Sequence, residues 1–410
     1  MSARTILLLT PQLPYPPHQG TSLRNWHILR GLAQTHRVSL LSFVEPEQTL
    51  AAAALQPLLA VCQELRTVPV PQRSTAIRLR QLLTSSLPDM AHRLHHPAFV
   101  LALRQWLTET PFDIVQVEGI ELARTIPVIR QISPDSRVLF DDHNAETELQ
   151  RRNLLTDVRK PTRWFAAAYS FIQTYRLRRY EQWAMQQSDW VVAVSEQDAH
   201  LLRLLAPDNP ITVIPNSLDT AHGYLALTGR PALPFDLLFT GKMDYRPNVD
   251  AVLWFAEAVW PQIRAARPQT TWAIVGQKPH ERLNKLAQEP GITVTGWVES
   301  VQPYLAGAQL FLMPFRVGSG TRLKLIEAMA AGKAIVSTTV GAEGFPLQSG
   351  RELILADGAT ALAQAVLRLL ADEGERGRLG AAAYQFAQQY DWRVVVPRFN
   401  ALYEQYPKAT

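Results

Sequence analysis

The stretch FLMPFRVGSGTRLKLIEAMAAGKAIVSTTVGAEGF occupies residues 311–345 of the chain. In order, it reads as an apolar strand, a glycine turn, an amphipathic helix, a second apolar strand and another glycine turn. Thr321 is the predicted N-cap of the helix, and the first backbone N–H groups of a helix have no partner within it. Since the positive end of the helix dipole lies behind those groups, the start of this helix predicts an anion site.

Charged side chains surround that predicted anion site. Arg322 and Lys324 add two cations, and Glu327 follows Lys324 by three residues, on nearly the same helical face. A phosphate at the helix start and a hydroxylated group beside the helix would satisfy all three side chains. The stretch therefore predicts a nucleotide or nucleotide-sugar site. Its predicted ligand-binding residues are Gly318, Ser319, Gly320, Thr321 and Glu327.

The composition is that of a globular chain with two domains. Its 410 residues exceed one average core, and 47% hydrophobic with 19% charged residues excludes disorder. No apolar run reaches the roughly eighteen residues of a spanning helix, and the first residues fit a core strand better than a signal peptide. The single cysteine, Cys62, allows no intrachain disulfide, which is typical of a reducing cytoplasm. The formal charge of +5 suits anionic substrates or an anionic membrane surface.

Strand-like and helix-like segments alternate along the chain, which predicts parallel sheets covered by helices on both faces. We therefore predict an α/β fold with two Rossmann-like, doubly wound domains. The predicted parts are a first domain (1–219), a linker (220–234), a second domain (235–385) and a helical tail (386–410) that packs back on the first domain. The predicted strands are 5–10, 37–43, 113–117, 137–140, 190–194, 211–214, 236–240, 272–275, 292–295, 310–313 and 334–337. Ligands on such sheets bind beyond the carboxyl ends of the strands, so the cleft between the domains is the expected site.

Polar residues follow the strands of the first domain. Gly20 and Arg24 lie in the first strand–helix connection, where they either approach a substrate or form an ordinary turn with a solvated arginine. His143, directly after the strand at 137–140, either acts as a hydrogen-bonding or acid–base group or satisfies a buried carbonyl. Glu118 follows the strand at 113–117. We predict a functional role for His143, and contacts of Arg24 and Glu118 with an acceptor.

Other polar residues support weaker interpretations. Lys242, after the strand at 236–240, can reach a diphosphate or remain solvated, and Asn248 is predicted to cap the next helix. No cluster of histidine, cysteine and acidic residues has metal-ligand spacing, so no metal is expected. The pair Gly318-x-Gly320 lacks the third glycine of a dinucleotide motif, so the match does not support a nicotinamide enzyme.

Residues 151–180 are rich in arginine and aromatic side chains. Such a segment suits an anionic membrane surface, whereas nucleic acid is the other common partner of a basic patch. A solvated helix with an aromatic core face is the alternative. We predict a membrane surface and no nucleic acid. The basic residues are Arg151, Arg152, Arg159, Lys160, Arg163, Arg176, Arg178 and Arg179, and the aromatic ones are Trp164, Phe165, Tyr169, Phe171 and Tyr175.

The sequence resembles the retaining GT-B glycosyltransferases of family 4 over nearly its full length. PPHQGTSLRNWHILRGLAQTHRVSLLS resembles the opening loop and helix of that family, and SDWVVAVSEQDAHLL with ITVIPNSLD resembles the end of its first domain. FTGKMDYRPNVDAVLWFAEAVWPQI and residues 296–345, which contain the opening stretch, resemble its second domain. This glycine-rich form is similar to a subgroup linked to bacterial surface polysaccharide assembly.

The resemblance implies transfer of a sugar from a nucleotide-diphosphate donor, with retention of configuration and without a metal or other cofactor. It implies a first domain that binds a glycan or lipid-linked acceptor and a second that binds the donor. Arg322 and Lys324, or Lys242, match the positions that hold the diphosphate, and Glu327 matches the acid that bonds the ribose. His143 matches the histidine that lines the sugar site, and Gly20 matches a residue near the donor phosphate or acceptor. The implied catalytic residues are His143, Arg322 and Lys324.

Two positions depart from the family pattern. The family commonly has two glutamates eight positions apart, and Ser319 stands where the first would fall. Lys242 stands where an arginine is more usual. A nucleotide-sugar epimerase and a non-catalytic nucleotide-sugar-binding protein are the alternatives. A cytoplasmic location is expected, with attachment to the inner face of the plasma membrane as a further expectation.

Overall fold

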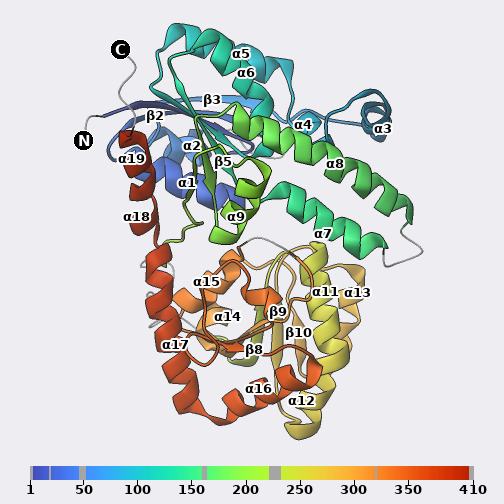
Figure 1. Ribbon diagram of the computed structural model, residues 1–410. Helices are drawn as coiled ribbons and strands as arrows, with labels where there is room; N and C mark the ends of the chain where they lie inside the picture. Colours follow the sequence, from blue (N-terminus) through green and yellow to red (C-terminus); the bar gives the residue numbers. More distant parts are fainter. Residues whose placement is uncertain are drawn as a thin grey trace. The chain divides into compact units, whose positions relative to one another are not determined.

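The computed structural model describes residues 3–17, 20–45, 52–158, 164–220, 232–318 and 321–405 (Figure 1). The chain divides into two compact units. Unit 1 comprises Met1–Ser217 and Trp392–Thr410, and unit 2 comprises Leu218–Asp391. Most of the predicted linker, residues 221–231, lies outside the described residues.

Unit 1 is built on a seven-stranded parallel sheet with the order β3-β2-β1-β4-β5-β6-β7. Helices pack on both faces of the sheet, so its central strands are buried on both sides. The strands are β1 (Thr5–Thr10), β2 (Arg37–Val44), β3 (Glu64–Pro69), β4 (Ile114–Glu118), β5 (Arg137–Asp142), β6 (Trp190–Ala193) and β7 (Ile211–Val213). The helices are α1 (Gly20–Leu32), α2 (Ala52–Leu59), α3 (Thr75–Thr84), α4 (Asp89–Arg93), α5 (Pro97–Glu109), η1 (Ile120–Thr125), α6 (Ile126–Ile132), α7 (Glu146–Val158), α8 (Trp164–Gln186) and α9 (Glu196–Leu205).

The end of the chain also belongs to unit 1. Helices α18 (Trp392–Val395) and α19 (Pro397–Glu404) pack beside α1, as Figure 1 shows. Val396 and Phe399 are buried in the same apolar core as Ile28 of α1. Gly31 permits this close packing, because a Cβ at that position would lie 2.5 Å from Cγ1 of Val396.

Unit 2 is built on a six-stranded parallel sheet with the order β10-β9-β8-β11-β12-β13. Its strands are β8 (Phe235–Thr240), β9 (Trp272–Val275), β10 (Ile292–Val294), β11 (Ala308–Met313), β12 (Ala334–Ser337) and β13 (Ile354–Leu355). Its helices are α11 (Arg246–Trp254), η4 (Phe255–Val259), α12 (Trp260–Ala266), α13 (Glu281–Asn284), η5 (Leu286–Gln288), α14 (Gln302–Gly307), α15 (Leu323–Ala330), η6 (Val340–Ala342), α16 (Ala359–Ala371), α17 (Glu373–Ala387) and η7 (Gln388–Tyr390).

The predicted α/β fold with two Rossmann-like sheets is confirmed, and the predicted strands all form. The sequence missed two edge strands. In β3, ELRTVP, two polar residues separate Leu65 from Val68 and only Val68 is buried, so no apolar run marks it. β13 has two residues, which is too short to give a pattern.

Candidate functional site

In unit 2, polar side chains gather where the order of strands reverses. The chain runs from β8 toward β10 on one side of the sheet, and from β11 toward β13 on the other. At such a switch point, the loops after the two central strands separate and leave room for a ligand. β8 leads into Gly241 and Lys242, and β11 leads through Gly318 into α15. The predicted nucleotide residues therefore come from both sides of the switch point.

Helix α15 begins later than the sequence predicted. It starts at Leu323, its N-cap residue is Arg322 with extended backbone, and no side chain from that residue caps the first turn. The prediction of Thr321 as N-cap was wrong, because Thr321 precedes the helix by two residues. The first turn of α15 thus presents backbone N–H groups and the side chain of Lys324 together, which suits an anion.

Lys324 is the best-defined cation of the group. Its Nζ donates to the carbonyl oxygen of Thr240 at 2.7 Å and to Oδ1 of Asn248 at 2.9 Å. An ammonium has three donors, and none of the described residues takes the third. The ammonium also lies 4.7 Å from the ring centroid of Phe239 and 5.2 Å from that of Phe315. Burial, with Arg322 nearby, lowers the pKa of Lys324 to about 7.

The approach of Lys324 depends on a glycine after β8. A Cβ at Gly241 would lie 2.4 Å from Nζ of Lys324 and 2.8 Å from Nδ2 of Asn248. Asn248 was predicted as a helix cap, and this was wrong. It lies inside α11, where its amide donates to the carbonyl oxygen of Lys242 and accepts from Lys324. Asn248 therefore belongs to the candidate site through its contact with Lys324, which the sequence pattern did not show.

Glu327 lies one turn after Lys324 on α15 and is partly exposed. Burial raises the pKa of its carboxyl group, and Lys324 opposes that shift. Among the residues that the structure describes, none hydrogen-bonds to this carboxylate, and its exposed part can accept from a ligand. Glu327 therefore has unused acceptor capacity beside the cationic start of the helix.

The other predicted residues of unit 2 lie around this group. Arg322 is buried, donates from Nε to the carbonyl oxygen of Val340 at 3.3 Å, and stacks over Phe315. Gly318 has a φ of 130°, and a Cβ there would lie 2.7 Å from Nη2 of Arg322, so only glycine fits. Lys242 is half-exposed, with Nζ 3.8 Å from Oδ2 of Asp244. Ser319 and Gly320 lie outside the described residues.

In unit 1, Glu118 and His143 meet at the carboxyl ends of the neighbouring strands β4 and β5. Oε2 of Glu118 lies 2.8 Å from Nε2 of His143. Glu118 is fully buried, and His143 keeps a small exposed edge. Burial raises the pKa of Glu118 to about 7, and burial lowers the pKa of His143. A Cβ at Gly119 would lie 3.6 Å from Nδ1 of His143, so this glycine leaves the second nitrogen uncovered.

Two buried hydrogen bonds in series fix the side chain of Glu118. The hydroxyl group of Tyr403, in α19, donates to Oε1 of Gln116, and Nε2 of Gln116 donates to Oε1 of Glu118. All three side chains are buried. The carboxyl group of Glu118 is thus held at both oxygens. Glu118 positions His143, and its burial removes it from direct contact with a ligand.

Arg24 occupies a different place from the one predicted. It was expected in a loop, either on an anion or in solvent, but it lies in α1 with only 2% of its surface exposed. Its guanidinium group makes two hydrogen bonds with Asp141, at 2.9 and 3.0 Å, and donates to the carbonyl oxygens of Ile214 and Pro215. Arg24 therefore neutralises a buried carboxylate in the unit-1 site. Gly20 is the exposed first residue of α1.

Buried acids also fix the loop that carries His143. Glu181 accepts from the backbone N–H of Glu146 at 2.7 Å, and Asp198 accepts from that of Ala145 at 3.2 Å. Asp142 is buried next in sequence to His143, and burial together with Glu181 raises its pKa well above the ordinary value. The sequence showed the density of acids here but not their role as backbone anchors.

Glu118, Asp141 and His143 each offer one ligand atom within 4.8 Å of the others. Sequence spacing could not show this cluster, because the three residues come from two strands. The atoms that could bind a metal ion already have hydrogen-bond partners. Asp141 pairs with Arg24, and Glu118 accepts from Gln116 and bonds to His143. The guanidinium group of Arg24 would also repel a second cation, so the cluster suits a hydrogen-bonded network better than a metal ion.

Known families match both units. Residues 18–222 match the model described as Glycosyltransferase Family 4, and residues 234–372 match that of Glycosyl transferases group 1. The first match covers half of the chain. The chain therefore belongs to glycosyltransferase family 4, and the predicted family and glycosyltransferase activity are confirmed.

Individual relatives agree with this assignment. The chain is 24% identical over 347 residues to phosphatidyl-myo-inositol mannosyltransferase of Mycolicibacterium smegmatis. This alignment covers 83% of this chain and 79% of the relative. It is 24% identical over 264 residues to glycogen synthase of Mycobacterium tuberculosis, covering 60% and 61% of the two chains.

Solved structures show the same GT-B fold. Sucrose-phosphate synthase from Thermosynechococcus elongatus superposes with a TM-score of 0.69 at 18% identity, over 98% of each chain. Anabaena HepE, solved in complex with UDP and glucose, gives a TM-score of 0.66 at 13% identity, over 98% of this chain and 99% of that one.

Proposed function

We propose that this chain transfers a sugar from a nucleotide-diphosphate donor to a hydroxyl group of a glycan or lipid-linked acceptor, with retention of configuration. The observation that carries the donor assignment is the arrangement on α15. Glu327 has no hydrogen-bond partner among the described residues, and it lies one turn from the cationic start of the helix. A nucleoside diphosphate offers a diphosphate for the cations and ribose hydroxyls for the carboxylate.

The cations of unit 2 would act on the leaving group. Negative charge develops on the diphosphate as the glycosidic bond breaks, so donors fixed at the start of α15 stabilise the transition state more than the ground state. Lys324 and Arg322 are the residues proposed for this role, with Lys242 as a more exposed third cation. Removal of one such donor typically costs on the order of 3 kcal/mol, or about a hundredfold in rate.

We also propose that no metal ion takes part. Two cationic side chains already stand at the start of α15, where a metal ion would otherwise neutralise the diphosphate. The ligand-like cluster in unit 1 supports the same proposal, because its carboxylates pair with Arg24 and His143.

The acceptor would be reached at a membrane surface. None of the helices within the described residues is long and apolar enough to cross a bilayer. Helix α8 exposes Trp164, Phe171 and Tyr175 on one face, and Arg178 and Arg179 continue that face. An exposed aromatic stripe with arginines suits the inner face of an anionic membrane. Arg159, Lys160 and Arg163 lie outside the described residues.

The name of the mycobacterial mannosyltransferase includes phosphatidyl-myo-inositol, a lipid, and this supports a lipid-linked acceptor. A role in assembling cell-surface polysaccharide would be consistent with such an acceptor. This proposed role rests on the glycine-rich sequence of residues 316–330.

A donor panel tests the proposed reaction. The protein is incubated in EDTA with UDP-, GDP- and ADP-sugars and a bacterial lipid extract, and release of nucleoside diphosphate is measured. The proposal predicts release with one donor class and a product whose anomeric configuration, determined by NMR, equals that of the donor. Saturable donor binding without release under any acceptor would indicate a binding protein, and loss of activity in EDTA would contradict metal independence.

The membrane surface has its own test. Arg178→Gln with Arg179→Gln should weaken binding to vesicles that contain phosphatidylglycerol, and the difference from the unaltered protein should shrink as salt rises. Equal binding of both proteins at low salt would contradict the role of α8.

A further inference from the structure

Helix α19, at the end of the chain, reaches the Glu118–His143 pair through one hydroxyl group. The hydroxyl group of Tyr403 donates to Oε1 of Gln116, and Nε2 of Gln116 donates to Oε1 of Glu118 at 2.5 Å. The side chains of all three residues in this series are buried. Burial raises the pKa of Tyr403 well above its ordinary value, so its hydroxyl group stays protonated. The series therefore begins with a permanent hydrogen-bond donor.

That donor decides which way the amide group of Gln116 faces. An amide offers one oxygen as acceptor and one NH₂ group as donor. If the amide turned over, its NH₂ group would face Tyr403, and the hydroxyl hydrogen would have no acceptor among the described residues. A buried donor without a partner is unfavourable. Tyr403 therefore keeps the NH₂ group of Gln116 directed at Glu118.

The amide in turn restricts where Glu118 can carry a proton. Oε1 of Glu118 accepts from Gln116, so a proton on Oε1 would face another donor. Oε2 of Glu118 lies 2.8 Å from Nε2 of His143, which can accept a hydrogen bond when it carries no proton. A proton on Glu118 is thus confined to Oε2, and the neutral ring of His143 then carries its own proton on Nδ1.

The charged groups around the pair have a different effect. Burial raises the pKa of Glu118 and lowers that of His143. The charges that modify these shifts come from three other elements: Arg24 of α1, Asp141 of β5 and Glu121 of η1. Arg24 bonds both oxygens of Asp141, so a proton is favoured on Glu118 over Asp141. These charges affect the pH at which a proton binds, whereas the amide contact decides which oxygen of Glu118 takes it.

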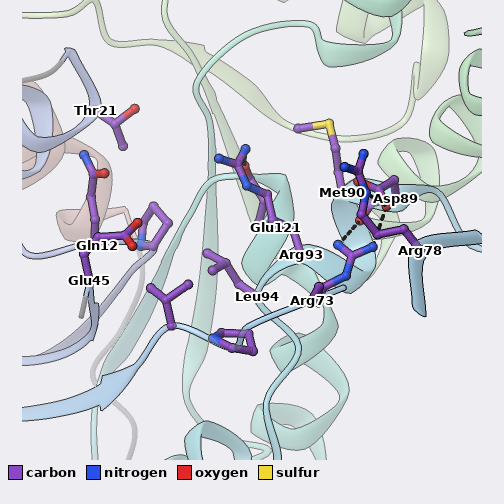
Figure 2. Close-up of a pocket in the computed structure, with 13 residues that line it drawn as sticks. Gln12, Thr21, Glu45, Arg73, Arg78, Asp89, Met90, Arg93, Leu94 and Glu121 are labelled. Carbon is purple, nitrogen blue, oxygen red and sulfur yellow. Dashed lines mark hydrogen bonds and ion pairs between the residues drawn. The ribbon is translucent and has the colours of Figure 1, made fainter. Parts of the chain in front are cut away.

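The second ring nitrogen of His143 lies close to a residue that lines a cavity. A Cβ at Gly119 would lie 3.2 Å from Oε2 of Glu121 and 3.6 Å from Nδ1 of His143, so those two atoms are near each other. Glu121 lines a cavity of about 690 Å³, where Figure 2 shows it beside Arg93. Nδ1 is a donor when it carries a proton and an acceptor when it does not. The position of the Glu118 proton therefore changes the hydrogen bonds available near this cavity.

We propose that Tyr403 is a positioning residue that, through Gln116, confines the proton of Glu118 to the oxygen facing His143. Nδ1 of His143 then changes from acceptor to donor when Glu118 takes up a proton. The part of His143 in sugar transfer rests on the proposed function, whereas the placement of the proton does not. This inference gives α19 a role beyond filling the apolar core of unit 1.

¹⁵N NMR of histidine-labelled protein tests the proton placement without donor, acceptor or turnover. The His143 signals are identified by their loss in His143→Gln. At pH 6, below the Glu118 pKa of about 7, the unaltered protein should hold mainly the Nδ1–H form. In Tyr403→Phe, the amide can turn over and accept a proton from Oε1 of Glu118. The ratio of Nδ1–H to Nε2–H should then fall roughly fivefold, the contribution of one neutral hydrogen bond. An unchanged ratio would overturn the proposal.

Asn400→Ala is the matched control on the same helix. Oδ1 of Asn400 lies 3.1 Å from Nε2 of His36, so this variant loosens α19 but keeps the hydroxyl group of Tyr403. Urea unfolding should show a loss of stability, while the NMR ratio should equal that of the unaltered protein. If Asn400→Ala changed the ratio as much as Tyr403→Phe, α19 would act by general packing and the proposal would be wrong.

The pH profile of turnover links this role to the proposed reaction. In the unaltered protein, kcat should change as pH passes through about 7, and in Tyr403→Phe this change should shrink while the KM for the donor is kept. A merely structural residue would lower kcat by the same factor at every pH, and such a result would rule out the positioning role. A failure of the proposed function would instead appear as no release of nucleoside diphosphate, with the NMR difference intact.

Discussion

Oε2 of Glu118 lies 2.8 Å from Nε2 of His143; Glu118 ends β4, and His143 directly follows the adjacent strand β5. Since burial lowers the pKa of His143, its ring is neutral near pH 7, with one nitrogen donating and the other accepting. The protonation state of Glu118 then selects the tautomer. Above its pKa of about 7, the carboxylate accepts from Nε2–H and leaves Nδ1 as an acceptor beside Gly119. Below it, the protonated carboxyl group donates to Nε2, and Nδ1 carries the proton.

Replacement of Glu118 should therefore alter the behaviour of His143. In the unaltered protein, ¹⁵N NMR should show the Nε2–H tautomer growing as pH rises through about 7, and Glu118→Gln should remove that transition. We expect kcat to fall by up to about a hundredfold, the order of loss when a group at the chemistry is misplaced by about 1 Å. The KM for the donor should change little. A tautomer that stays constant from pH 5 to 9 in the unaltered protein would contradict this assignment.

Arg24 should matter for stability. Arg24→Ala leaves the buried carboxylate of Asp141 without its cation, and loss of one partner of a buried pair costs about 3–5 kcal/mol. Urea unfolding measures this change. Arg151→Ala, which breaks a more exposed pair with Glu148, is the control and should cost no more than about 1 kcal/mol. Equal effects of the two substitutions would show that the Arg24 pair is not structural.

The sequence predicted those features that depend on local pattern. Buried parallel strands read as continuous apolar runs, so the strands of both sheets could be recognised except the edge strands β3 and β13. Lys324 and Glu327 could be paired because they lie one turn apart on one helix. Contacts between distant segments had no such signal. Asn248 meets Lys324 across 76 residues, Arg24 meets Asp141 across 117, and Tyr403 meets Gln116 across 287. Those pairs depend on strand order, which side-chain periodicity does not give.

Donor affinity should depend on pH through Lys324. Burial lowers its pKa to about 7, so the free protein loses this cation as pH rises above that value. A bound diphosphate favours the ammonium form, so binding above pH 7 requires uptake of a proton. The Kd of the preferred nucleoside diphosphate should rise about tenfold per pH unit between pH 7.5 and 9.

Calorimetry in buffers of different ionisation enthalpy measures this proton uptake. Lys324→Arg should flatten the pH profile, because arginine stays charged. Lys242→Met is the matched control and should keep the slope, since Lys324 is retained. A flat profile in the unaltered protein would show that Lys324 does not face the diphosphate.

The assignment of α15 as the nucleotide site is tested most directly at Glu327. Calorimetry with UDP, GDP and ADP first identifies the nucleotide that binds, and Glu327→Gln is then compared with the unaltered protein. If the carboxylate holds the ribose, the Kd for that nucleoside diphosphate rises at least tenfold, about 1.4 kcal/mol, while the Kd for inorganic pyrophosphate changes less than twofold. An unchanged Kd for the nucleoside diphosphate would contradict the placement of the donor on α15.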